Sequence, residues 1–366
     1  MKKNKPCAVL AAGGFLLFMM SCSPAPDKHT KASFYTLDDF TQVPKIDAHV
    51  HIRTYDTAFV RQAGMDNFRL LSIVVDEDPG IEAQQQYAIY QMKKHPEIVS
   101  FATTFSVKDF DSGDWARQTI DSLQQSIKDG AIAVKVYKNI GMELKDRQGS
   151  SVMIDNPKFR PVWNFLMQAH IPVIGHLGEP KNCWLPVEQM TIDSDKRYYT
   201  RHPEFHMYLH PEFPSYDNQV AARDHMLEQN PQLTFIGAHL GSLEWSTDEL
   251  AKRLDRFPNM AVDLAARISH LQLQAMKDRK KVQDFFIKYQ DRLLYGTDRI
   301  AEDPGSPDEF NSFVHQAWLN DWQFFCTEDT MRSKSFDGVF KGLNLPKDVV
   351  HKIYYTNAVN RFNILK

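Results

Sequence analysis

From about residue 45 to its C-terminus, the chain alternates short apolar runs with longer amphipathic runs. This alternation is typical of parallel strands that are each followed by a covering helix. Eight runs have the length and composition of buried strands: 45–52, 68–75, 98–105, 131–137, 171–176, 233–239, 260–265 and 292–297. Helical patterns follow at 81–94, 114–128, 157–169, 218–229, 246–256 and 271–288. Eight strands close a barrel, so the sequence predicts an α/β chain folded as a (β/α)8 TIM barrel.

The composition agrees with a large globular fold. Of the 366 residues, 43% are apolar and 12% are aromatic, which is enough for a sizeable core. The formal net charge is -3, so the chain offers no broad basic surface for nucleic acid. We therefore expect no nucleic-acid partner.

Residues 1–21 have the features of a bacterial export signal. Lys2, Lys3 and Lys5 precede the apolar stretch 8–20, which is shorter than the about 20 residues that a membrane-spanning helix needs. The stretch leads into Met-Met-Ser-Cys at 19–22, which resembles a lipobox, so Cys22 is expected to carry a lipid. Cleavage by an ordinary signal peptidase and an uncleaved anchor are the alternatives. We predict an exported protein that is lipid-anchored in the bacterial envelope, on the periplasmic face or at the cell surface.

The predicted organisation is a lipoprotein signal peptide at 1–21, a linker at 22–44 and the barrel at 45–366, with a long loop at about 177–217. This loop is rich in aromatic residues, His and Pro, and it leaves the fifth strand at the end where barrel active sites are assembled. We expect it to wall or cover a pocket; an inert surface insertion is the alternative. Cys183 and Cys326 lie far apart in the sequence and are expected to stay unpaired.

Histidine and aspartate residues recur at the ends of the predicted strands. His49 and His51 alternate with apolar residues, so their side chains point to the same side of the first strand, as two ligands of one metal ion would. His176 ends the fifth strand, His239 ends the sixth, and Asp298 follows the eighth. Each histidine alone is equally well explained by packing. Because the C-terminal ends of all barrel strands meet at one rim, their coincidence predicts a divalent-metal site.

These positions resemble the metal and catalytic set of the amidohydrolase superfamily, in particular the amidohydrolase-related branch that also contains decarboxylases and lactonases. The resemblance includes the segments 233–242, 295–298 and 352–362 and covers the chain from about residue 45 to its end. It implies that His49, His51, His176 and Asp298 hold one metal ion, while His239 acts on the bound water or the substrate. Zinc suits this donor set, with manganese, iron and nickel as alternatives.

Lys135 bears on the number of metal ions. In two-metal members of the superfamily, a carbamylated lysine at the end of the fourth strand bridges the metals, and Lys135 lies near the equivalent position. Lys135 and His239 would then also be ligands. Contact with substrate and pairing with a carboxylate are the other interpretations of this lysine, and we expect a single ion.

The resemblance also implies roles in catalysis. Asp298 is expected to accept a proton from metal-activated water, and His239 to polarise or protonate the substrate or to orient the water. Asp263 lies in an otherwise apolar strand and is interpreted either as support for a ligand histidine or as a structural hydrogen-bonding residue. Six residues beyond the strands are candidates for substrate binding, with plain surface positions as the alternative: Tyr137, Lys138, Glu179, Trp184, Arg267 and Arg299. Because arginine suits a carboxylate, a carboxylate-bearing small-molecule substrate is expected.

Three functions fit this pattern. The first is hydrolysis of a small-molecule C–N or ester/lactone bond through a metal-activated water, and this is our prediction. The second is metal-dependent non-oxidative decarboxylation, which occurs in the same branch. The third is a non-catalytic surface protein that binds a ligand with its aromatic loop, although such a protein has no need of both His239 and Asp298.

Overall fold

All eight predicted strands form in the computed structural model, which describes residues 1, 33–302 and 306–364. The predicted signal segment beyond Met1 and the predicted lipid site Cys22 lie outside the described residues. Each strand pairs in parallel with the next along the chain, so the barrel prediction is confirmed. The strands are β1 (Lys45–Arg53), β2 (Phe68–Ile73), β3 (Val99–Thr104), β4 (Ala131–Val136), β5 (Val173–Gly175), β6 (Phe235–Gly237), β7 (Met260–Asp263) and β8 (Leu293–Leu294).

The barrel closes through a segment that the sequence analysis did not assign to a strand. β9 (Arg299–Glu302) pairs in parallel with the C-terminal half of β1. Ahead of β9, the Ala48 N–H donates to the Tyr295 carbonyl at 3.0 Å, and the Asp298 N–H donates to the His49 carbonyl at 2.7 Å. The stretch from β8 to β9 therefore joins the last strand of the barrel to the first.

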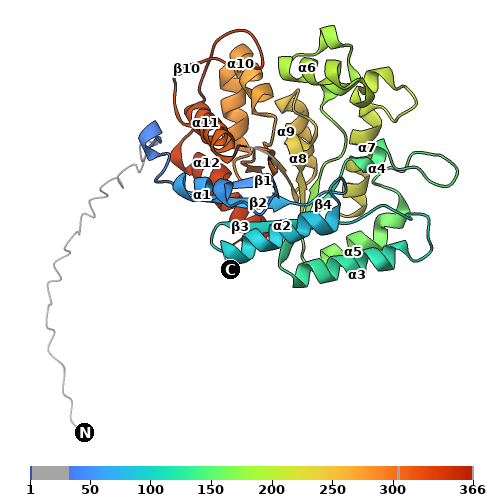
Figure 1. The fold of residues 1–366 in the computed structure, drawn as a ribbon. Helices are drawn as coiled ribbons and strands as arrows, with labels where there is room; N and C mark the ends of the chain where they lie inside the picture. The colour runs from blue at the N-terminus through green and yellow to red at the C-terminus, as the bar shows by residue number, and fades with distance from the viewer. Residues whose placement is uncertain (2–32, 303–305, 365–366) are drawn as a thin grey trace, which may run out of the picture. The chain divides into compact units, whose positions relative to one another are not determined.

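Helices surround the strands (Figure 1). Six correspond to the predicted helices: α2 (Ile81–Lys94), α3 (Trp115–Lys128), α5 (Arg160–Gln168), α7 (Tyr216–Gln229), α9 (Thr247–Arg256) and α10 (Ile268–Lys288). Two further covering helices were not predicted, α1 (Ala58–Met65) and α11 (Pro307–Cys326). Within the described ranges, no helix is both long and apolar enough to span a membrane.

The remaining elements are short. They are α4 (Asn139–Met142), α6 (Asp193–Arg201), α8 (Ala238–Gly241), α12 (Lys347–His351), α13 (Asn357–Phe362) and a hairpin of β10 (Thr330–Met331) and β11 (Phe340–Lys341). Residues 33–44, which the sequence analysis placed in the linker, pack on the barrel unit. The Phe40 ring contacts the rings of Phe68 and Trp322, and the Trp322 indole N–H donates to the Thr36 carbonyl at 2.9 Å.

Small side chains fill the inside of the barrel. Ala48, Ala102, Ala133 and Ala261 belong to one buried cluster with aliphatic residues of the other strands, whereas the large aromatic residues pack between strands and helices. Gly175 shows how tight the fit is, because a Cβ atom there would lie 2.4 Å from the Phe235 ring. Alternating small and large side chains lets the strands approach at native packing density.

A buried carboxylate fixes the closure of the barrel. Asp47 on β1 accepts hydrogen bonds from the Thr297 N–H at 3.0 Å, the Thr297 hydroxyl at 2.6 Å and the Trp318 indole N–H at 3.0 Å. Burial raises the pKa of Asp47 to about 6 although these donors act in the opposite direction. One side chain thus links β1, the end of β8 and α11.

A second, partly buried acid lies behind this closure. Asp321 on α11 accepts a hydrogen bond from the Tyr295 hydroxyl at 2.8 Å. Burial raises the pKa of Asp321 to about 7, and the Tyr295 hydroxyl and Arg299 only partly oppose this shift. An acid whose pKa is raised in the folded state favours folding less as it ionises.

We therefore expect ionisation of Asp321 to lower the free energy of unfolding as pH rises from about 4 to 7. In Asp321→Asn this contribution to the pH dependence should be absent. The asparagine oxygen still accepts the Tyr295 bond but cannot ionise, so the variant should gain about 1–2 kcal/mol relative to the wild type between pH 5 and pH 8. Urea unfolding at both pH values measures the difference, with the exposed Asp337→Asn as control. A variant that follows the wild-type pH profile would contradict the assignment.

Candidate metal centre

Two histidines of β1 and the aspartate after β8 converge at the C-terminal end of the barrel. His51 Nε2 lies 3.2 Å from Asp298 Oδ1, and His49 Nε2 lies 3.4 Å from the same oxygen. His49 is fully buried, whereas 31% of the Asp298 side chain is exposed. Three predicted ligands therefore meet at one point, and Asp298 is the one that can be reached from outside.

The Nδ1 atom of each of these two histidines is hydrogen-bonded within the protein. His49 Nδ1 lies 2.8 Å from Asp263 Oδ2, and His51 Nδ1 lies 2.7 Å from the Ile73 carbonyl oxygen. Because these oxygens only accept, both Nδ1 atoms carry the proton, and both Nε2 lone pairs face Asp298. This arrangement is typical of metal-binding histidines. Asp263 thus supports a predicted ligand, the first of the two roles expected for it.

The distances fit a bound cation. Ligand atoms that each lie about 2.0–2.1 Å from a tetrahedral ion are separated by about 3.3 Å. The Nε2 atoms of His49 and His51 stand 3.4 and 3.2 Å from the Asp298 oxygen. The buried Nε2 of His176 has no hydrogen-bond partner, which is a further donor atom left free for a ligand. The residues present therefore fit a divalent metal ion.

His176 and His239 form a second group beside the first. Their ring centroids lie 4.3 Å apart, and the His239 ring lies 4.8 Å from that of His49. His176 Nε2 faces Glu179 Oε2 at 4.0 Å, so His176 is not in the cluster of His49, His51 and Asp298. His239 Nδ1 lies 2.9 Å from the Ala265 carbonyl oxygen and therefore carries the proton, which leaves a lone pair on Nε2. Burial lowers the pKa of His239 to about 3.

Lys135 on β4 reaches the same point. Its Nζ lies 3.2 Å from His49 Nε2, and the residue is 1% exposed. Burial lowers the pKa of Lys135 to about 8, although Asp263 and Asp298 act in the opposite direction. Lys135 is thus close enough to the predicted ligands to bridge two ions or to contact a substrate.

Two of these side chains depend on unusual backbone. His239 has φ = 58° and Asp298 has φ = 64°, both in the left-handed region that residues other than glycine seldom adopt. Asp263 Oδ1 accepts from the His239 N–H at 2.8 Å, and the His49 carbonyl accepts from the Asp298 N–H. Such strain, of order 1–3 kcal/mol per residue, persists where surrounding bonds enforce it and is concentrated at functional sites.

The predicted substrate-binding residues after β4 and β5 are engaged with acids. The Tyr137 hydroxyl donates to Glu77, which also pairs with Arg53. The Lys138 ammonium donates to Glu179. These two pairs lie beside the histidines, since the Tyr137 ring contacts that of His176 and Glu179 faces the same residue.

The other three predicted substrate residues lie in different surroundings. The Trp184 indole N–H donates to the Pro214 carbonyl at 3.3 Å, so its polar atom is used within the long loop. Although burial lowers the pKa of Arg267, the carboxylates of Asp195 and Glu244 raise it above its ordinary value. Arg299 directly follows Asp298 and lines a large cavity.

This cavity has a volume of about 810 Å³ and opens beside Asp298. Its walls come from the ends of β7 and β8, the first turn of α10, α11 and the segment 330–335. A volume of this size accommodates a small organic molecule. Asp298 is the one predicted metal ligand among the described residues that line this cavity.

Much of the long loop after β5 is helical, and one of its residues lines the larger cavity. Ser194 in α6 lines the cavity, and the Asp193 N–H donates to the Ser335 carbonyl at 2.6 Å. Asp195 Oδ2 lies 3.3 Å from His270 Nε2 and attaches α6 to α10. Cys183 and Cys326 are buried and unpaired, as predicted.

Sequence reasoning did not identify Asp47, Asp195 or His270 as part of this region. The register of β1 shifts between Asp47 and Val50, and Asp47 contacts Trp318 of α11, so simple alternation along the strand does not place Asp47 with His49 and His51. Asp195 and His270 are far apart in the chain and meet only through the fold, and no local pattern marks their contact.

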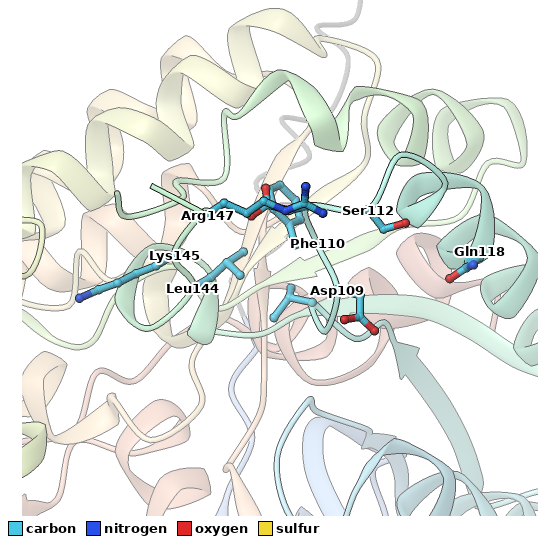
Figure 2. A pocket seen from close by; sticks show the side chains of 9 residues that line it. Asp109, Phe110, Ser112, Gln118, Leu144, Lys145 and Arg147 are labelled. Atoms are coloured by element: carbon cyan, nitrogen blue, oxygen red, sulfur yellow. The ribbon is translucent and has the colours of Figure 1, made fainter. Parts of the chain in front are cut away.

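A second cavity of about 450 Å³ lies between the loop after β3 and the loop after α4. Figure 2 shows Asp109, Phe110 and Ser112 on one side and Leu144, Lys145 and Arg147 on the other. None of the predicted metal ligands or substrate residues lines it. Two of the predicted residues, Asp298 and Arg299, line the larger cavity instead.

A family model described as Amidohydrolase matches residues 46–364. Among solved structures, 2,6-dihydroxybenzoate decarboxylase from Rhizobium is 14% identical with a TM-score of 0.52, over 88% of this chain and 99% of that chain. A probable 2-pyrone-4,6-dicarboxylic acid hydrolase from Acinetobacter baumannii is 11% identical with a TM-score of 0.47, over 87% of this chain and 99% of that chain. Dihydroorotase from Campylobacter jejuni is 12% identical with a TM-score of 0.45, over 88% of this chain and 84% of that chain.

At such identities the decarboxylase supports the fold and says nothing about the substrate. No curated protein sequence matches the chain. The family match covers the whole barrel, including every predicted metal ligand. The chain therefore belongs to the amidohydrolase family.

Proposed function

We propose that this chain is a metal-dependent hydrolase that cleaves a C–N or ester/lactone bond of a small molecule with an activated water. One observation carries the proposal. The Nε2 lone pairs of His49 and His51 face one Asp298 oxygen at tetrahedral ligand spacing, while both Nδ1 atoms are held by the protein. A site prepared in this way is suited to activating water beside a substrate.

We propose one metal ion, with zinc preferred, held by His49, His51, His176 and Asp298. A divalent ion at such a site lowers the pKa of bound water from about 15.7 toward about 7 and polarises a carbonyl group. Lys135 would be a ligand only with two ions, together with His239. The short distance from Lys135 Nζ to His49 Nε2 supports this two-ion alternative, which the metal content tests.

The chain's own residues have separate tasks in this proposal. Asp298 accepts the proton of the attacking water in this proposal, and its position in the lining of the cavity supports that role. His239 donates its Nδ1 proton to the Ala265 carbonyl, so its Nε2 atom can accept a hydrogen bond but has no proton to give. This tautomer favours orientation of the water by His239 over protonation of the substrate, the two roles that the sequence left open.

The ligand assignment predicts the metal content of the purified protein. We expect about one equivalent of zinc in the wild type and a sharp loss in Asp298→Asn, because the amide gives up the charge of the carboxylate ligand. Elemental analysis after dialysis measures the content. Asp321→Asn, which removes an acid from the same cavity, is the matched control and should keep its metal. Two equivalents would support Lys135 as a bridge, and equal content in Asp298→Asn would contradict the assignment.

Asp263 is expected to act as a positioning residue. In Asp263→Asn, the Oδ1 acceptor of the His239 and Ala265 N–H groups is retained, but an amide N–H replaces the acceptor of the His49 proton. We expect the affinity for zinc to fall about 10- to 100-fold with the fold retained. Competition with a chelating dye measures the affinity, and circular dichroism checks the fold. Unchanged affinity would show that Asp263 has only a structural role.

Product analysis separates hydrolysis from decarboxylation. We expect that lactones, amides and esters incubated in ¹⁸O-labelled water give labelled acid products without carbon dioxide, because the new oxygen comes from solvent. Asp298→Asn should lose this incorporation by about 100-fold or more. Release of carbon dioxide from a carboxylic acid, with no label in the product, would favour the decarboxylase alternative instead.

A further inference from the structure

The described residues that line the large cavity carry more positive than negative charge. Its lining contains Arg299, Arg332 and Lys334, against the carboxyl groups of Asp298 and Asp321. Asp298 belongs to the candidate metal centre, where a cation offsets its charge. Burial raises the pKa of Asp321 to about 7, so its charge is only partly present near neutral pH. The part of the cavity beyond the metal centre is therefore cationic.

The side chains of Arg299, Arg332 and Lys334 form no ion pair or hydrogen bond with other described residues, although Arg299 acts electrostatically on Asp321. Arg299 Nε is buried without a partner, and its guanidinium lies 4.4 Å from the Phe313 ring centroid. A buried guanidinium N–H without an acceptor is costly, and an oxyanion supplies the acceptor that it lacks.

The arrangement places these charges at two depths. Arg299 directly follows Asp298, both residues line the cavity, and the Arg299 guanidinium lies against Phe313 of α11. Arg332 and Lys334 are exposed on the connection between β10 and β11, which forms the outer wall. The Asp193 N–H holds this connection through the Ser335 carbonyl, so the outer charges are fixed to the helical loop after β5.

We propose that Arg299, Arg332 and Lys334 form an oxyanion subsite that holds a carboxylate or phosphate group of the substrate. Arg299 binds the anionic group nearest the cleaved bond, and Arg332 with Lys334 attracts the anion at the mouth. This inference rests on the proposed function, because it takes Asp298 as the reacting end of the cavity. It assigns the substrate to the acidic small molecules and adds Arg332 and Lys334 to the residues that determine specificity.

The experiment is ligand binding, measured by calorimetry on the full metal-loaded protein. The probes are benzene-1,3-dicarboxylate, phenyl phosphate and the uncharged benzene-1,3-dicarboxamide. The variants are Arg299→Gln and the double variant Arg332→Gln/Lys334→Gln. Lys341→Gln is the control, because Lys341 is an exposed lysine of the same hairpin that does not line the cavity. Metal content is measured on every sample.

We expect at least one anionic probe to bind more tightly than the dicarboxamide, and the affinity to fall as salt rises. Loss of one charge-assisted hydrogen bond should weaken binding about tenfold or more in Arg299→Gln, and the double variant should lose salt dependence. Lys341→Gln should bind like the wild type. The tighter of the two anionic probes identifies carboxylate or phosphate as the bound group.

Equal binding of the dicarboxamide, or wild-type affinity in both cavity variants with metal content intact, would overturn the subsite and leave the proposed function standing. Absence of metal from the wild type would count against the proposed function instead. The two failures are thus distinguishable.

Discussion

The buried carboxylate of Asp47 is the contact on which the arrangement of the site depends. It accepts bonds from Thr297 and Trp318, so the first strand, the end of the last and the helix after it are fixed to one side chain. His49 lies two residues after Asp47, and Asp298 directly follows Thr297. The hydrogen bonds of Asp47 therefore fix how far apart the two candidate ligands lie. The chemistry proposed for the site thus depends on a residue that touches no substrate.

Much of the barrel could be predicted because burial leaves a local mark. A parallel strand covered on both faces is a continuous apolar run, and all eight such runs became strands. β9 is short and mostly exposed, with no apolar run to mark it, and it forms because β1 offers a free edge there. In α11, Val314, Trp318, Trp322 and Phe325 recur at helical spacing and are buried, so this helix could also have been found from the sequence.

In the candidate site, too, only the features that follow from local sequence patterns could be predicted. Strand ends carry His49, His51 and Asp298 to one rim, and that follows from topology alone. Contacts between distant segments decide the rest of the site. They determine whether His176 joins these residues, which nitrogen of His239 carries the proton, and which cations line the cavity. The Ala265 carbonyl, the Glu179 carboxylate and the connection 330–335 have no sequence signature for these partners.

The closure of the barrel has a consequence for the order of folding. Asp47 and Thr297 are 250 residues apart in the chain, so their contact closes a loop that contains most of the barrel. Contacts of such separation are the slowest to form, because the intervening chain must first become ordered. The proposed metal site therefore requires that the last strand has docked on the first. Uptake of its ion would then mark completed closure of the barrel.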